Sequence, residues 1–159
     1  MSVPKSRIRA AAVLPMSALT DELAQKLRTQ TIIVADAALL SPEQINLCHK
    51  TCDADNSPVA GDWKRQGRIF SVNNGGKEFF PAYQFDDALQ PRPIIKTILE
   101  ALGDQIEGWN VAAWFHFPNG WLSHRDARGA AVAVAPKDAL DRPDDVIAAA
   151  RKNRATYLA

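Results

Sequence analysis

Hydrophobic residues recur at helical spacing in several segments of this chain. Residues 17–29 carry leucines four positions apart between charged residues, namely Leu19, Leu23 and Leu27. This spacing predicts an amphipathic helix, and the β-branched run at 31–35 is either its continuation or an extended connector. Residues 93–102 place five aliphatic side chains on one helical face and end at Gly103. Further helices are expected over about 104–116 and 142–157.

Two short helices are predicted in the middle of the chain. Ser41-Pro42-Glu43-Gln44 combines an N-cap, a proline at the first helical position and a glutamine that can complete a capping box. Ser57-Pro58 repeats the N-cap and the proline and opens a second helix, which stops at Gly67. The two helices are therefore joined by a short connection before Ser57.

A β-hairpin is expected directly after this helix pair. Residues 68–72 and 77–81 are predicted as strands joined by Asn73-Asn74-Gly75-Gly76, whose residues accept positive φ angles. Two helices followed by such a hairpin are typical of a winged helix-turn-helix. Residues 86–93 are expected as a linker, and 123–135 as a long loop without a sustained hydrophobic period. The predicted fold is mainly α with a small antiparallel β-hairpin.

The charge balance excludes a general electrostatic attraction to nucleic acid or membranes. The 159 residues include 19 Lys and Arg and 18 Asp and Glu, giving a formal net charge of +1. Affinity for an anionic partner must therefore come from local clusters of basic side chains. The apolar runs are shorter than the roughly 20 residues of a membrane helix, and residues 1–15 read as an N-terminal arm rather than a signal peptide. We expect a cytoplasmic protein.

Two cysteines lie close together on the first of the two short helices. Cys48 and Cys52 flank His49, which raises the alternative of a metal site. A structural zinc site usually needs four ligands in two close pairs, and His116 and His124 lie far away without a partner pair. We therefore expect reduced thiols, with Cys48 as a small core residue, and neither a metal nor a cofactor.

Several motifs along residues 40–152 resemble those of a known family. They are Trp63-x-x-x-Gly67-Arg68-Ile69-Phe70-x-Val72, Phe80-Pro81-Ala82-Tyr83-Gln84-Phe85-Asp86, Trp109-x-x-x-x-Trp114-Phe115, Pro118-Asn119-Gly120-Trp121-Leu122, Pro136-x-Asp138-x-Leu140 and Val146-x-x-Ala149-Ala150. In order and spacing they resemble antitoxin-like proteins that join a helix-turn-helix to a toxin-binding domain of the Xre/MbcA/ParS kind. The resemblance implies an arm and helix at 1–36, a winged helix-turn-helix at 37–86 and a helical toxin-binding-like domain at 87–159.

The family resemblance also implies partners. Such proteins bind a cognate toxin, notably of the RES type that degrades nicotinamide dinucleotide, and often repress their own operon. We expect a homodimer that binds operator DNA, and a toxin-binding surface formed by two segments. The expected contact residues are Asn119, Trp121, Leu122, Pro136 and Asp138, with Trp121 presented by a turn outside the helical core.

The expected DNA-binding residues belong to the second short helix, its end and the hairpin. They are Lys64, Arg65, Arg68, Asn73, Asn74 and Lys77. A recognition helix with a basic end and a wing near phosphate is how such modules bind DNA. Acids at positions 53, 55 and 62 oppose this reading, so the alternative is a protein-interaction module whose helix-turn-helix does not read DNA.

Most other aromatic and titratable residues are expected to be structural. Trp63, Trp109, Trp114 and the nearby phenylalanines are expected in the core, where Gln84 can bond to buried backbone. His116 or His124 with Asp126, and the pair Asp86 and Asp87, lack the context of a catalytic motif. We therefore expect no enzyme activity.

Overall fold

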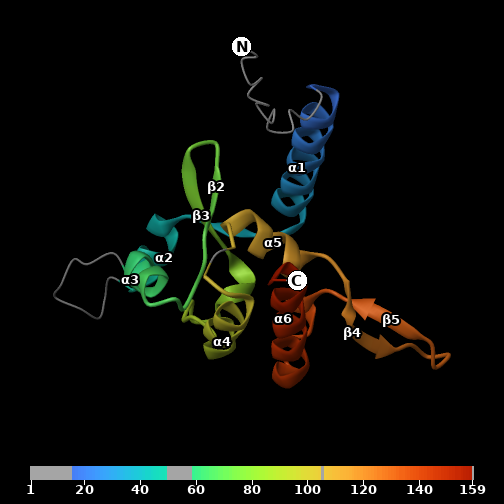
Figure 1. The fold of residues 1–159 in the computed structure, drawn as a ribbon. Helices are drawn as coiled ribbons and strands as arrows, with labels where there is room; N and C mark the ends of the chain where they lie inside the picture. The colour runs from blue at the N-terminus through green and yellow to red at the C-terminus, as the bar shows by residue number, and fades with distance from the viewer. Residues whose placement is uncertain (1–15, 50–58, 105, 159) are drawn as a thin grey trace, which may run out of the picture.

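The protein is mainly helical, with two small antiparallel sheets (Figure 1). The computed structural model describes residues 16–49, 59–104 and 106–158. Its helices are α1 (Met16–Asp36), α2 (Pro42–His49), α3 (Val59–Arg65), α4 (Pro93–Leu102), α5 (Gly108–His116) and α6 (Pro143–Leu158). Its strands are β1 (Leu39–Leu40), β2 (Val72–Asn74), β3 (Lys77–Pro81), β4 (Asn119–Arg125) and β5 (Ala131–Val134), and two 3-10 turns span Ala82–Gln84 and Pro136–Asp138. The predicted fold class is confirmed.

The first half of the chain has the topology of a winged helix-turn-helix. Its elements follow the order α1, β1, α2, α3, β2, β3, and the sheet order is β1-β3-β2. Strand β3 pairs antiparallel with both neighbours, for example Phe80 with Leu40 and Lys77 with Asn74. Because β1 precedes the helix pair and joins the hairpin after it, the sheet closes over one side of α2 and α3.

The helix cap predicted at Ser41 and the glycine turn of the hairpin both form. The Ser41 amide donates to Gln44 Oε1 at 2.8 Å and the Gln44 amide donates to Ser41 Oγ at 3.2 Å, which completes the capping box. The hairpin turn is shorter than the predicted one: only Gly75 and Gly76 separate the paired strands, with φ angles of 61° and 78°. Two successive positive φ angles match the right-handed twist of a hairpin.

Two hydrophobic clusters meet at the segment before β2. The smaller lies between α2, α3 and the sheet and contains Ile45, Ala60, Trp63, Ile69, Phe80 and Phe85. The larger joins Phe70 and Val72 to buried residues of α4, α5 and α6. The rings of Phe70 and Phe115 stack with centroids 5.6 Å apart. The larger core therefore spans the expected boundary at residue 86.

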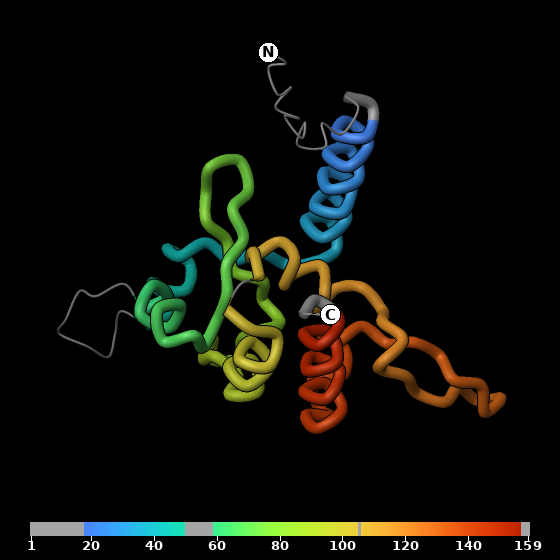
Figure 2. The backbone as a smooth tube through the Cα atoms, viewed as in Figure 1, coloured from blue at the N-terminus to red at the C-terminus, as the bar shows by residue number. Residues whose placement is uncertain are grey.

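Helix α1 is longer than the amphipathic pattern alone suggests and projects from the rest of the molecule (Figure 2). The run at 31–35 continues the helix to Asp36 instead of forming a connector. Among the residues of α1 whose side chains the structure describes, Ile33, at 1% exposure, is the one that belongs to the large core. The leucine stripe at 19, 23 and 27 is about half exposed, so it does not face this core.

Several expectations from the sequence are wrong. Residues 123–135 do not form a long loop, because most of them belong to the hairpin of β4 and β5. Strand β2 begins at Val72 instead of Arg68, because the backbone of Phe70 bonds to the Gln84 side chain. Cys48 is exposed rather than a core residue. The arm at 1–15, Cys52 and the cap at Ser57-Pro58 lie outside the described residues.

Candidate nucleic-acid interface and partner surface

Helix α3 is fixed by α2 and by the aromatic core below it. The Ala60 amide near the start of α3 donates to Asn46 Oδ1 of α2 at 3.2 Å. Trp63 is 8% exposed, and its ring meets His49 edge-on at 5.1 Å and Phe85 at 6.2 Å. Trp63 is therefore a core residue, as expected. Its burial leaves Lys64 and Arg65 on the exposed side of the helix.

The wing is held by α5 as well as by its own turn. Trp109 Nε1 donates to the Asn73 carbonyl at 2.8 Å, and Asn73 Oδ1 accepts from the Gly76 amide at 3.1 Å. Gly108 lies so close to the strand segment that a Cβ there would stand 2.1 Å from the Ser71 carbonyl oxygen. The Asn73 side chain thus stabilises the turn, whereas Asn74 and Lys77 are exposed at its end.

Lys64 forms an ion pair with the wing. Its ammonium donates to Glu78 Oε1, which also accepts from Ser71 Oγ at 2.7 Å. The hydrogen bond from Lys64, followed by that from Ser71, lowers the pKa of the Glu78 carboxyl below its usual value. Glu78 therefore stays ionised and holds the Lys64 charge against β3.

The other two cations at α3 also have intramolecular contacts. Arg65 pairs with Asp62 one turn earlier on the same helix. The Arg68 guanidinium lies 5.7 Å from the centre of the Trp63 ring, a cation–π contact. Lys77 has no ion-pair partner among the residues that the structure describes. The structure thus places three of the expected cations at α3, and acids pair with two of them, Lys64 and Arg65.

Glu78 is the residue of this site that the sequence reasoning missed. The register of β2 and β3 pairs Glu78 with Asn73, and its carboxylate reaches the Lys64 ammonium of α3. The alternation of side chains along β3 carries this signal, because Phe80 two positions later is fully buried on the helix side. Residues two apart on a strand lie on the same face, so Glu78 is expected to face α3 as Phe80 does.

The expected partner surface is only partly exposed. Trp121 on β4 is 54% exposed, and Lys152 Nζ of α6 lies 5.0 Å from its ring centre. Asn119 Oδ1 accepts from the Trp121 amide at 3.0 Å. Leu122 at 1% exposure and Pro136 are buried, so these two side chains anchor β4 and the following turn instead of offering a contact.

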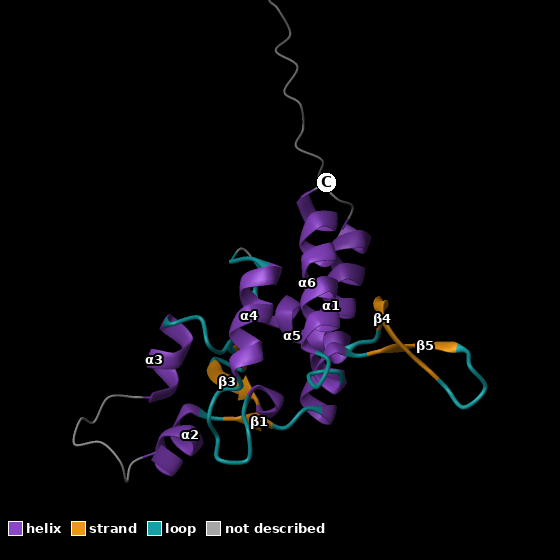
Figure 3. Cartoon of the chain, turned by 90° about the horizontal axis from the view of Figure 1, so that it is seen from below, coloured by secondary structure: helices purple, strands orange, loops and turns teal. Residues whose placement is uncertain are grey.

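Asp138 completes the expected set at the edge of this surface. Its carboxylate is exposed and lies 3.3 Å from Lys137 Nζ. The β4–β5 hairpin extends from the side of the molecule opposite to α3, as Figure 3 shows. The candidate nucleic-acid interface and the Trp121 surface are therefore separate and do not overlap.

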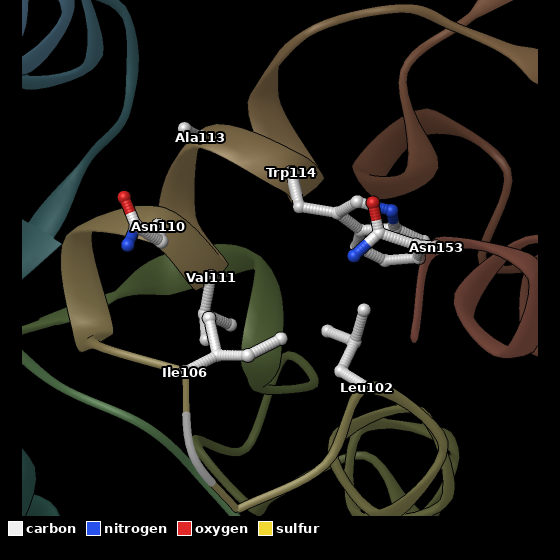
Figure 4. Close-up of a pocket in the computed structure, with 7 residues that line it drawn as sticks. All are labelled: Leu102, Ile106, Asn110, Val111, Ala113, Trp114 and Asn153. Carbon is white, nitrogen blue, oxygen red and sulfur yellow. The ribbon is translucent and has the colours of Figure 1, made fainter. Parts of the chain in front are cut away.

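A small cavity lies where α4, α5 and α6 meet (Figure 4). Its volume is about 200 Å³, and its lining residues are Leu102, Ile106, Asn110, Val111, Ala113, Trp114 and Asn153. The wall combines apolar side chains with the amides of Asn110 and Asn153 and carries no charged side chain. None of these lining side chains is a nucleophile paired with a base.

Two of the residues named above as catalytic candidates, His116 and Asp126, have structural partners. His116 is 8% exposed, and its Nε2 lies 3.3 Å from Asp36 Oδ2 at the end of α1. Asp126 accepts from the backbone amides of Arg128 and Ala130, which fixes the turn between β4 and β5. Across residues 16–49, 59–104 and 106–158, no three His, Cys, Asp or Glu residues are grouped to hold a metal ion.

Comparison with known proteins shows a similar fold but no family. The structure resembles the NMR structure of Rv2175c, with a TM-score of 0.57 and 21% sequence identity, over 74% of this chain and 81% of that chain. No protein-family model matches the sequence, and no curated protein matches it significantly. Within the described part of the chain, no helix is long and apolar enough to span a membrane. The likeness to Rv2175c is evidence for the fold alone.

Proposed function

We propose that this chain is an antitoxin-like, cytoplasmic regulator that binds operator DNA as a dimer through α3 and the wing. The observation that carries the proposal is the strand order β1-β3-β2 around α2 and α3, the topology of a winged helix-turn-helix. In this arrangement α3 enters the major groove and the wing tip with Lys77 approaches a phosphate. The β4–β5 surface carrying Trp121 binds the partner toxin that the family resemblance implies.

The ion pairs at α3 determine how DNA binding would work. Lys64 and Arg65 are each bound to a carboxylate, and each acid near the DNA backbone opposes the gain from counterion release. Phosphates would replace Glu78 and Asp62 as partners of these cations. Breaking these two ion pairs therefore reduces the net gain from DNA binding, whereas Arg68 and Lys77 can contact phosphate without breaking an ion pair.

The test is binding of the purified protein to the DNA upstream of its own gene, across a range of salt concentrations. Alanine at Lys64, Arg65 or Arg68 should weaken binding and lower the log–log salt slope by about one each. Glu78→Gln should strengthen binding, because it frees Lys64 from its partner. Arg128→Ala, at the tip of the opposite hairpin, is the matched control and should leave DNA affinity unchanged.

A second function is favoured by the same ion pairs. If Lys64 and Arg65 stay bound to Glu78 and Asp62, the module has few free cations and serves as a protein-interaction domain with a non-reading helix-turn-helix. The two functions give different results in the DNA experiment. A protein that retards no upstream fragment at low salt, with or without Glu78→Gln, while still binding a protein partner, supports the interaction module.

A further inference from the structure

Helix α1 carries an exposed apolar stripe. Its members are Leu19 at 47% exposure, Leu23 at 58%, Leu27 at 54% and Val34 at 38%. Spacings of four, four and seven residues place these side chains on one face of the helix. A helix of 21 residues with such a face normally buries it against another element, because contiguous exposed apolar surface marks an interaction site.

Helix α1 contacts the rest of the described protein through its C-terminal half. Ile33 lies in the large core, and α1 packs against α5. Lys26 Nζ reaches Glu107 Oε2 at 3.4 Å, but both side chains remain about half exposed. The N-terminal part of the helix projects away from the sheet and the other helices (Figure 1). The stripe is therefore open to a partner that approaches along the helix axis.

The charges beside the stripe indicate whether a second copy of α1 would pack against it in a parallel or an antiparallel orientation. Glu22 and Lys26 are one turn apart and lie along the same edge of the stripe, whereas Thr20 and Thr31 on the other edge are uncharged. In an antiparallel pair related by a two-fold axis, each edge faces the same edge of the second copy. Glu22 of each copy then faces Lys26 of the other. A parallel pair would place the charged edge against the uncharged one.

We propose that α1 pairs with α1 of a second copy of this chain, antiparallel, with the two-fold axis near Leu23. Leu19 of one copy then packs beside Leu27 of the other, and two Glu22–Lys26 pairs flank the seam. This surface gives the dimer of the proposed function its contact, and in that sense the inference rests on that function. Self-association without DNA tests the dimer separately, because a protein that fails to bind DNA can still form it.

The first test measures the mass of the full chain in solution by sedimentation equilibrium over a range up to about 100 µM, where a weak dimer still forms. We expect a dimer, and Leu23→Glu should raise its dissociation constant about a hundredfold or more by placing two carboxylates at the seam. Ile32→Glu is the matched control: Ile32 is 45% exposed, but on the opposite face of α1. A monomeric parent protein, or a Leu23→Glu variant that dimerises normally, would overturn the proposal.

The second test exchanges the charges and stays informative if Leu23→Glu is poorly folded. Glu22→Lys should weaken the dimer, because Lys26 of the other copy then faces a like charge. Adding Lys26→Glu to the same chain should restore the dimer. If the double variant is as weak as the single one, or if neither changes association, the antiparallel pairing is wrong. Alanine at Lys64 or Arg65 should leave the dimer unchanged.

Discussion

Tyr83 is a partly buried residue with a buried hydroxyl at the contact between the winged module and the C-terminal helices. Its ring lies 5.2 Å from Phe115 and 6.4 Å from Phe70, and its hydroxyl oxygen has no hydrogen-bond partner among the described residues. Burial raises the pKa of this hydroxyl above its ordinary value near 10. The folded chain therefore holds the phenol proton at a pH where the unfolded chain releases it.

This proton predicts how stability changes at high pH. In the unmodified protein, the Tyr83 hydroxyl should leave the free energy of unfolding unchanged below about pH 10. Above this pH the free energy of unfolding should fall, because the unfolded state then loses a proton that the folded state keeps. Tyr83→Phe should remove that part of the fall and should keep or increase the free energy of unfolding at pH 8 by up to about 2 kcal/mol. Urea unfolding at pH 8 and 10.5 measures both effects. A loss of stability at pH 8 would show that the hydroxyl is hydrogen-bonded.

Individual residues were predicted well where the sequence contains a local chemical reason. Gln84 was expected to bond to buried backbone, and it is fully buried with hydrogen bonds to Phe70 N, Phe70 O and Pro81 O. The location of Cys48 is not predicted correctly, because a small residue on an amphipathic helix can lie on either side of the boundary between core and surface. Its exposure follows from the position of α2 on the sheet, which composition does not encode.

Elements were predictable where caps or turns mark both ends. The second strand of the wing and α4 have the expected bounds, since glycines stop them or turn the chain. The β4–β5 hairpin was missed because its second strand is the short run Ala131–Val134 and its first strand is polar. The turn signal was Asp126 followed by Gly129, which has a φ of 79°. Only the pairing itself reveals that this turn joins two strands.

The β4–β5 hairpin carries the prediction for partner binding. Trp121→Ala removes a half-exposed side chain, so the free energy of unfolding should change by less than about 1 kcal/mol. Affinity for a toxin encoded beside this gene should fall about thirtyfold, as expected for an exposed interface anchor worth about 2 kcal/mol. Calorimetry and co-purification measure these two quantities on the same sample.

Trp109→Ala is the matched control for that experiment. Trp109 is 7% exposed and its indole bonds to the wing, so its loss should cost about 3 to 5 kcal/mol of stability. Binding should be weakened only in proportion to the unfolded fraction. If Trp121→Ala unfolds the protein instead, or binds the toxin normally, then this face is not the partner surface.

At the scale of the whole molecule, the two clusters are joined by one stretch of backbone. Ile69 belongs to the small cluster and Phe70 to the large one, so the segment before β2 runs between them. Gln84 fixes that segment from the other side through the backbone of Phe70. Local opening of either cluster therefore disturbs the backbone that the other requires, and the winged module and the C-terminal helices should unfold together.

Phe115→Ala tests this coupling. Phe115 is fully buried in α5 and contacts the rings of Phe70, Tyr83 and Trp114, so its truncation should cost about 3 to 5 kcal/mol. Because the core is shared, circular dichroism of the helices and fluorescence of the tryptophans should report one transition shifted to the same lower urea concentration. Leu47→Ala, at a position 68% exposed, should shift it by less than about 0.5 kcal/mol. Two separate transitions, with α2 and α3 retained after the C-terminal helices unfold, would show instead that the winged module is stable without the core on which the wing and α5 now depend.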